Sequence, residues 1–249
     1  MLSIMDLKTG WVGARSAYQI AAYSLPGLKT YPHSTALPVV EEGLILRVNE
    51  ERCEAVRISP NRLKEAQDLF LAALKLYLDG VQHGIIKPKG QDLYALDLFE
   101  VPVSYPRVTS ILKVLSEEAL VGWMIKSSVT YTLEELIRKK RTAEEVLDAY
   151  KAGFFKPMEG AFAHRDRRGS EGTDLHRLVR NYLIGIPVKL AVESDWIQNA
   201  YPQFEQWAKA HQLTLVEGLS EMKVYHPEHK MAGTLDAVVT WEVVDGIPV

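Results

Sequence analysis

The turn dipeptide Asp245-Gly246 near the C-terminus constrains the fold more than any other feature of the sequence. Asp-Gly is a strong signal for a two-residue hairpin, so an antiparallel strand is expected to follow it. Only Ile247-Pro248-Val249 comes after the turn. We therefore expect residues 2–8 to continue that strand, so that one strand is divided between the two ends of the chain.

Composition favours one folded domain without a general attraction for polyanions. With 249 residues, 47% of them apolar, the chain can bury a sizeable core. The formal net charge is −3, so any nucleic-acid contact must come from a local basic cluster. We expect a single domain over residues 1–249, in which a linker at 86–104 separates residues 1–85 from residues 105–249.

Cysteine usage and hydropathy limit the compartment and the cofactors. Cys53 is the only cysteine, which excludes an intrachain disulfide and a cysteine-ligated zinc or iron–sulfur site within one chain. The N-terminus lacks the basic start and apolar core of a secretion signal, and no apolar run approaches the roughly 18 residues of a membrane span. We expect a soluble, cytoplasmic protein with no membrane partner.

Hydrophobic periodicity predicts strands and helices in alternation. Five runs have the β-branched, alternating character of strands: 43–48, 53–58, 214–218, 221–225 and 231–239. Ser59-Pro60 is typical of a helix start, and Thr132 with Glu135 indicates a capping box. The pattern predicts an α/β fold with a mixed central sheet and helices on both sides.

A carboxylate and an amine share one face near the N-terminus. Asp6 and Lys8 are two residues apart on a predicted strand, so their side chains point to the same side. Gln19 and Tyr23 lie one turn apart on the helix that follows. An acid, an amine and a supporting amide at one sheet edge suit metal-assisted hydrolysis, whereas the competing interpretation of Asp6 and Lys8 is a salt bridge at a strand end.

Two basic clusters are candidates for phosphate contact. Arg138-Lys139-Lys140-Arg141 ends a predicted helix, where a solvated turn that complements the helix dipole is the favoured interpretation. Arg165, Arg167 and Arg168 come just before the segment Gly172-Thr173-Asp174-Leu175-His176. Their place beside this candidate site favours phosphate contact.

In rotated order these segments resemble a known nuclease superfamily. When residues from about 104 to 249 are placed ahead of residues 1 to about 85, the sequence resembles the PD-(D/E)XK nucleases. The RecB-like exonucleases and the phage and mitochondrial genome maintenance exonucleases are the most similar pattern. The motifs that carry the resemblance are, in that order, residues 105–112 with Trp123, residues 172–176, Glu221, residues 232–236, residues 6–9 and residues 19–23. Leu235 stands where the family has the proline of its name.

The resemblance implies a restriction-endonuclease-like core in circularly permuted form. It further implies a metal-dependent deoxyribonuclease, most similar to exonucleases that act on single strands or free DNA ends in repair or recombination, and a phage origin is compatible with it. The ligands of Mg²⁺ or Mn²⁺ would be His176, Asp236, Asp6 and the backbone carbonyl of Leu7.

The resemblance also assigns roles around the metal. Asp236 and Asp6 would serve in catalysis, Lys8 would orient or activate the attacking water, and Gln19 would hold the site together. Glu221 would be either a further acidic group or a purely structural residue. Arg165, Arg167 and Arg168 would contact DNA, and Tyr23 would either pack or contact DNA.

Two other functions remain open from the sequence. One is a catalytically inactive DNA-binding or assembly module on the same fold. The other is a nuclease of the CRISPR-adaptation type, which would have to lack an iron–sulfur cluster because Cys53 stands alone. The rotated motif order is compatible with a monomer or with a homo-oligomer that exchanges halves between chains.

Overall fold

The chain groups into two compact units in the computed structural model, which describes residues 2–9, 12–98, 101–115, 128–130, 132–190 and 193–243, with the backbone alone at 101 and 157–168. The first unit comprises Met1–Leu115 and Asp174–Val249, and the second comprises Ser116–Thr173. The division therefore falls outside the stretch 86–104 that was expected to separate two parts of one domain.

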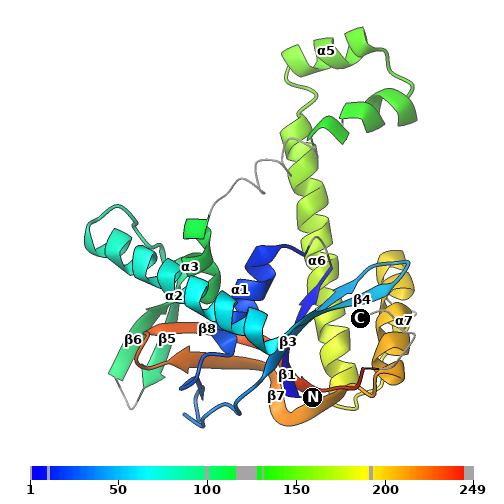
Figure 1. The fold of residues 1–249 in the computed structure, drawn as a ribbon. Helices are drawn as coiled ribbons and strands as arrows, with labels where there is room; N and C mark the ends of the chain where they lie inside the picture. Colours follow the sequence, from blue (N-terminus) through cyan, green and yellow to red (C-terminus); the bar gives the residue numbers. More distant parts are fainter. Residues whose placement is uncertain are drawn as a thin grey trace. The chain divides into compact units, whose positions relative to one another are not determined.

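A six-stranded mixed sheet forms the centre of the first unit (Figure 1). In spatial order its strands are β2 (Lys29–Thr30), β7 (Thr214–His226), β8 (Met231–Thr240), β1 (Leu2–Lys8), β3 (Glu42–Val48) and β4 (Cys53–Ile58). β1 is parallel to β3 and antiparallel to β8. The remaining neighbours pair antiparallel. The predicted α/β class with a mixed central sheet is confirmed.

Strands from opposite ends of the sequence lie side by side in this sheet. β1 pairs with β8 from Leu2–Thr240 to Met5–Ala237. Residues 244–249, which contain the Asp245-Gly246 turn and the expected continuation of the strand, lie outside the described residues. The pairing of β1 with β8 nevertheless brings the N-terminal and C-terminal candidate residues to one part of the sheet.

Helices cover both faces of the sheet, as predicted (Figure 1). One face packs against α1 (Ala14–Tyr23), α2 (Pro60–Gln82), α3 (Val108–Ile111) and the 3₁₀ turn η2 (Leu112–Leu115). The other packs against α7 (Asp195–Ala210) and the C-terminal part of α6 (Pro157–Leu183).

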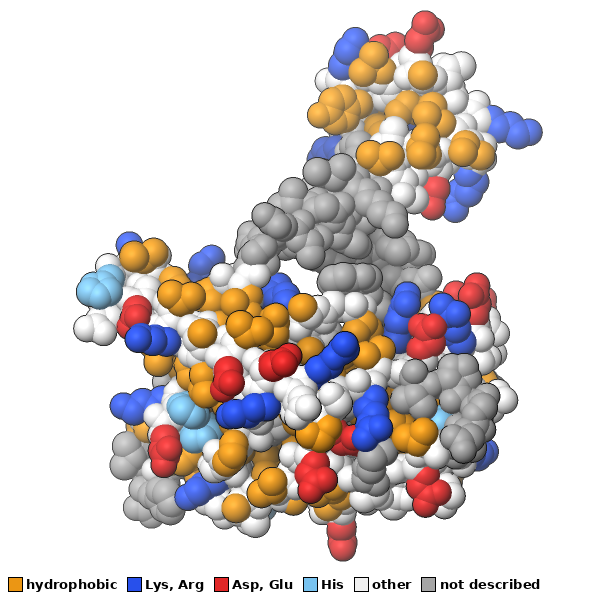
Figure 2. Space-filling model, in the orientation of Figure 1, with side chains coloured by type: hydrophobic (Ala, Val, Ile, Leu, Met, Phe, Trp, Pro, Cys, Tyr) orange, Lys and Arg blue, Asp and Glu red, His pale blue; other side chains and the backbone are white. Residues whose placement is uncertain are grey.

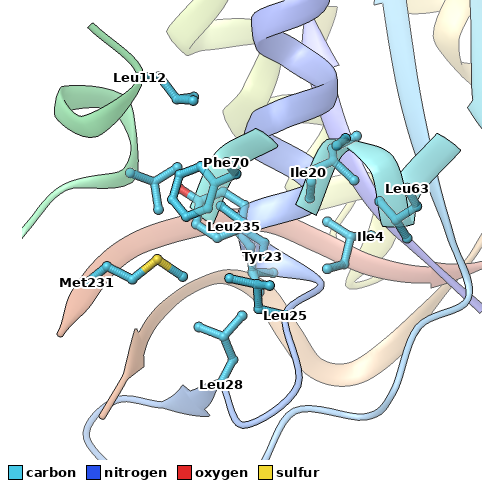
Figure 3. Packing of buried hydrophobic residues seen from close by; sticks show 14 of the residues in the cluster. Ile4, Ile20, Tyr23, Leu25, Leu28, Leu63, Phe70, Leu112, Met231 and Leu235 are labelled. Carbon is cyan, nitrogen blue, oxygen red and sulfur yellow. The ribbon is translucent and has the colours of Figure 1, made fainter. Parts of the chain in front are cut away.

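The alternation of β1 divides its side chains between these two cores. Ile4 joins the cluster with Ile20 of α1 and Phe70 of α2, as Figure 3 shows. Met5 and Leu7 join the cluster on the α6–α7 side. Because successive strand residues point to opposite faces, Asp6 emerges on the same face as Ile4.

The stretch 86–104, expected to be a linker, instead carries a hairpin. The 3₁₀ turn η1 (Gly90–Asp92) leads into β5 (Leu93–Leu98), which pairs antiparallel with β6 (Val101–Pro106) in a separate two-stranded sheet. Leu96 of β5 is buried together with Tyr225 and Ala232 of the main sheet. The apolar residues of this stretch therefore pack on the sheet, which is why it does not behave as a flexible connection.

Two local predictions were also wrong. Residues 214–218 and 221–225 belong to the single strand β7, with an irregularity in pairing between Leu215 and Ser220. Thr132 lies inside a helical segment, where its hydroxyl donates to the carbonyl of Ser128. The capping box is instead formed by Thr142 and Glu145 at the start of α5 (Ala143–Lys151).

In the second unit, several large apolar side chains are exposed to solvent (Figure 2). They are Val129, Leu133, Ile137, Leu147, Tyr150 and Phe154. Among the described helices, none is both long enough and apolar enough to cross a membrane.

Candidate metal centre

Three predicted acidic residues form a row across neighbouring strands β7, β8 and β1. The pairs Ser220–Ala237 and Met222–Leu235 place Glu221 opposite Asp236. The pair Met5–Ala237 places Asp6 beside Asp236 on the other side. The strand register, and not any local motif, therefore assembles the row.

Asp236 is held by the backbone of β1. Asp236 follows the Met5–Ala237 pair by one residue along the ladder. Its Oδ2 accepts a hydrogen bond of 2.8 Å from the backbone N–H of Leu7. This bond fixes one carboxylate oxygen and leaves Oδ1 available to a ligand. The contact of Leu7 with the site thus runs through its N–H, and the predicted role of its carbonyl stays a prediction.

Lys8 joins Asp6 to Gln19. The Lys8 Nζ lies 2.9 Å from Asp6 Oδ2 and 3.0 Å from Oδ1, and it meets the geometry of a hydrogen bond only to Oδ1. The same ammonium lies 3.4 Å from Gln19 Oε1 on α1. Asp6 Oδ2 is buried without a hydrogen bond, although a positive charge is close. An unsatisfied carboxylate oxygen of this kind is what a bound cation would satisfy.

His176 enters the row from α6. Its Nδ1 lies 3.6 Å from Asp236 Oδ2 and 3.8 Å from Glu221 Oε1. One ligand atom from each of His176, Glu221 and Asp236 lies within 4.8 Å of the others, a spacing suited to one ion. Their side chains are 30%, 35% and 16% exposed, so the cluster is open to solvent on one side.

Glu221 has an unusual backbone conformation. Its φ is +50°, in the left-handed region that residues other than glycine rarely adopt. Gly218, three residues earlier in the irregular part of β7, also has a positive φ, of 75°. The distortion lies where the Glu221 side chain meets His176, and strain of this kind is concentrated at functional sites.

The charges of the cluster shift one another's ionisation. Burial raises the pKa of Asp6 to about 6, opposed by Lys8 and assisted by the negative charge of Asp236. Burial likewise raises the pKa of Asp236, against the opposing effects of His176 and the Leu7 N–H. Burial alone would lower the pKa of His176, but Glu221 and Asp236 outweigh it and raise that pKa above its ordinary value. Carboxylates crowded in this way mark a candidate functional site.

The donor set fits a divalent cation. Carboxylate oxygens with one imidazole nitrogen suit Mn²⁺ and, with more oxygen ligands from water, Mg²⁺. His176, Glu221 and Asp236 would hold the ion. Asp6 lies in the same row, engaged with Lys8. The unsatisfied Asp6 Oδ2 and the mutual repulsion of the carboxylates both favour adding positive charge here.

Several predicted site residues occupy other roles or are not described. Tyr23 was expected either to pack or to contact DNA, and the structure shows packing, because the side chain is only 5% exposed and lies in the α1–α2 core. Its hydroxyl contacts the backbone at Thr234, and an added Cβ on Gly233 would lie 2.4 Å from it. The side chains of Arg165, Arg167 and Arg168 lie outside the described residues.

Sequence reasoning missed the contribution of the β5–β6 hairpin. The hydroxyl of Tyr94 on β5 lies 2.6 Å from Thr234 Oγ1, two residues from Asp236 on β8. Arg107 and Lys223 lie over the Tyr94 ring, at 4.7 Å and 6.0 Å from its centroid. The alternating apolar residues of 93–98 could have indicated a strand, but nothing local in the sequence gives its position beside β8.

A separate cavity of about 340 Å³ also lies in the first unit. Its lining includes Tyr77, Asp92, Ser110 and Lys113, and no residue of the acidic row contributes to it. Its polar groups are largely engaged with each other, because Asp92 accepts from Ser110 Oγ and pairs with Lys113. The cluster with the candidate chemistry is therefore the open row on the sheet and not this cavity.

Comparison with known proteins adds no relative. No protein-family model matches the chain, and the searches of curated proteins and of solved structures found no match.

Proposed function

We propose that the protein is a metal-dependent deoxyribonuclease, which hydrolyses phosphodiester bonds at single strands or free ends. The observation that carries the proposal is the meeting of His176, Glu221 and Asp236 next to the Asp6–Lys8–Gln19 network. One imidazole and two carboxylates together form a site for a cation. The adjacent Lys8 ammonium is a second positive charge, which stays in place when a substrate binds.

Phosphodiester hydrolysis requires charge neutralisation and a more acidic water. A bound Mg²⁺ or Mn²⁺ supplies both at the same place. Within the chain, Lys8 stands beside the row at 2.9 Å from Asp6, where it can orient a water and offset negative charge that develops on phosphate oxygens. Gln19 restrains the Lys8 ammonium, and the Leu7 N–H restrains Asp236.

We extend the proposal to the fold: the sheet would be a circularly permuted restriction-endonuclease-like core. Two findings support it. The strands that carry Asp236 and Asp6 are adjacent although they come from opposite ends of the sequence. The row, Lys8 and Gln19 are also brought together within one chain, so exchange of halves between chains is not needed to assemble them.

The test is degradation of single-stranded DNA labelled at either end, with Mn²⁺, Mg²⁺ or a chelator. We expect cleavage by wild type only with metal, and none by Asp236→Asn, which keeps the shape of the side chain. Lys75→Gln, at an exposed position of α2, is the control and should cleave as wild type does. Bound but intact DNA under every condition would refute the nuclease and support an inactive DNA-binding module.

A further inference from the structure

We propose that Arg107, Lys223 and Tyr94 form a subsite for a backbone phosphate of the substrate strand, next to the metal centre. This inference rests on the proposed function and extends it by naming where the flanking part of the strand is held. The three residues come from the β5–β6 hairpin, the segment after it, and β7.

Register places this subsite one step from the acidic row. Lys223 pairs with Thr234, whereas Glu221 lies opposite Asp236, so the two pairs are two residues apart along β7 and β8. Residues two apart on a strand are separated by about 7 Å. A phosphate bound by Lys223 would therefore belong to a nucleotide close to the one at the metal centre.

Tyr94 connects the hairpin to the row. Its hydroxyl lies 2.6 Å from Thr234 Oγ1, two residues before Asp236. The guanidinium carbon of Arg107 lies 4.7 Å from the centroid of the Tyr94 ring, and the ammonium of Lys223 lies 6.0 Å from it. The ring thus contacts both cations through cation–π attraction, which helps to hold each of them at this part of the surface.

The two cations are open to a ligand. Arg107 and Lys223 are both exposed. Arg107 uses its Nε to donate to the carbonyl of Leu93, at 3.1 Å, which leaves the two terminal nitrogens of its guanidinium for other partners. The carboxylate of Asp92, which lies just before β5, pairs with Lys113 and not with Arg107 or Lys223. On a chain with a net charge of −3, an exposed cation pair beside an acidic site indicates an anionic ligand.

The arrangement suits the phosphate of an extended strand. A guanidinium can bind two phosphate oxygens at once, and an ammonium adds a point charge. The acidic row repels phosphate until a cation binds there, so cations placed to one side can hold the strand independently of the metal. Arg107 is further fixed by an isolated parallel bridge of its backbone to Ala232 of β8.

The experiment measures DNA affinity without catalysis. A short fluorescein-labelled oligothymidylate is titrated in chelator, by anisotropy, at several salt concentrations between about 50 and 200 mM. The variant Arg107→Gln/Lys223→Gln is compared with wild type. The control pair is Arg62→Gln/Lys75→Gln, which removes the same charges from exposed positions of α2.

The expected result is weaker binding with a smaller dependence on salt. Each phosphate contact to a single strand contributes about 0.7 to the slope of log K against log salt, so loss of two makes the slope shallower by about 1.4. At the lowest salt the affinity should fall on the order of tenfold. Arg107→Lys/Lys223→Arg should keep the affinity within about threefold, because it preserves both charges.

An unchanged slope in the Gln pair, or an equal loss in the α2 control pair, would overturn the subsite. Failure of the proposed function looks different. If wild type never cleaves but binding depends on Arg107 and Lys223, the nuclease assignment falls and the subsite stands. If wild type cleaves and binding ignores the pair, only the subsite falls.

Discussion

The Lys8 ammonium contacts Asp6 and Gln19. Substitution by methionine removes the charge but keeps most of the length of the side chain, so it tests the charge itself. We predict that Lys8→Met lowers metal-dependent cleavage by about 10²–10⁴-fold, since positioned charge at a developing oxyanion contributes at that scale. The variant also leaves the Asp6 carboxylate, only 6% exposed, without its nearest ammonium, so the thermal stability should fall as well and is measured beside the activity. Full cleavage by Lys8→Met would remove Lys8 from the site, and Lys75→Met serves as the matched control.

Asp6 gives a second prediction, on stability against pH. Its pKa is about 6 in the folded protein and 3.8 in the reference state, so between these values the folded state binds more protons than the unfolded state. Stability therefore falls as pH rises through this window. From pH 4.5 to 7.5 the free energy of unfolding of the metal-free wild type should drop relative to that of Asp6→Asn by about 2 kcal/mol.

Urea unfolding in chelator at the two pH values measures this difference. His176 and Asp236 also have raised pKa values and contribute in the same direction in both proteins; because the Asp6 charge helps to raise the pKa of His176, part of the His176 contribution belongs to the measured difference. Asp68→Asn, at an exposed position of α2, should show a change below about 0.5 kcal/mol. A difference between wild type and Asp6→Asn that does not vary with pH would mean that Asp6 titrates as an ordinary carboxylate.

At the scale of elements, the bent part of β7 makes a prediction about Glu221. Glycine adopts a φ of +50° without the steric cost that other residues meet, so Glu221→Gly should be more stable than Glu221→Gln by about 1 kcal/mol. Both variants lose the carboxylate and should lose cation affinity together. Urea unfolding gives the stability and titration with Mn²⁺ gives the affinity; if the Gln variant is the more stable, the backbone there is not strained.

The contact of α1 with β3 depends on a glycine. A Cβ on Gly43 would lie 2.5 Å from Ile20 Cγ2 and 3.2 Å from Ile58 Cδ1, so α1 must shift outward to accept it. We predict that Gly43→Ala costs about 1–3 kcal/mol of unfolding free energy. Because Gln19 precedes Ile20 on α1, the shift should also weaken its 3.4 Å contact with Lys8 and lower cleavage.

Gly90→Ala is the matched control, since nothing lies within 4 Å of its added Cβ. Addition of Ile20→Ala to Gly43→Ala should cost less than Ile20→Ala costs in the wild-type background, since the smaller side chain makes room for the new methyl group. Strict additivity in this double-mutant cycle would contradict the overpacking argument.

Elements with strong periodicity could be predicted, and their long-range placement could not. The β3–β4 hairpin, α1 and the start of α2 followed from local patterns, and Asp6 with Lys8 followed from the alternation of β1. The β5–β6 hairpin was missed because its stability comes from packing of Leu96 on Tyr225 and Ala232, far away in sequence. For Tyr23, packing and DNA contact both stayed open, since a position one turn from Gln19 gives no information about burial.

The same limit applies to the candidate site. Asp236, His176 and Glu221 were singled out through a resemblance, but their distances depend on the register of β7, β8 and β1 and on the direction of α6. The positive φ of Glu221 and the Tyr94–Thr234 contact leave no local sequence signal at all. Local chemistry can be inferred from residue types, whereas the meeting of three distant segments is a property of the whole fold.

For the whole molecule, the cluster predicts that a cation and folding are thermodynamically linked. The unfolded chain does not hold His176, Glu221 and Asp236 within 4.8 Å of one another, so a cation binds mainly the folded state. At a Mn²⁺ concentration near 100 times the dissociation constant, stability should rise by about 2.7 kcal/mol. For the first unit this corresponds to an increase in melting temperature of about 5–10 °C.

The stabilisation should also depend on pH and on each ligand. It should shrink below about pH 6, where a proton occupies Asp6, and the raised pKa values of Asp236 and His176 add to this competition between protons and the cation. His176→Ala and Asp236→Asn should abolish most of it, while His83→Ala, at an exposed position after α2, should keep it. If Mn²⁺ still raises the melting temperature of both His176→Ala and Asp236→Asn, the ion binds elsewhere on the molecule. The acidic row would then be a strained structural feature, in which strand register alone holds the carboxylates together.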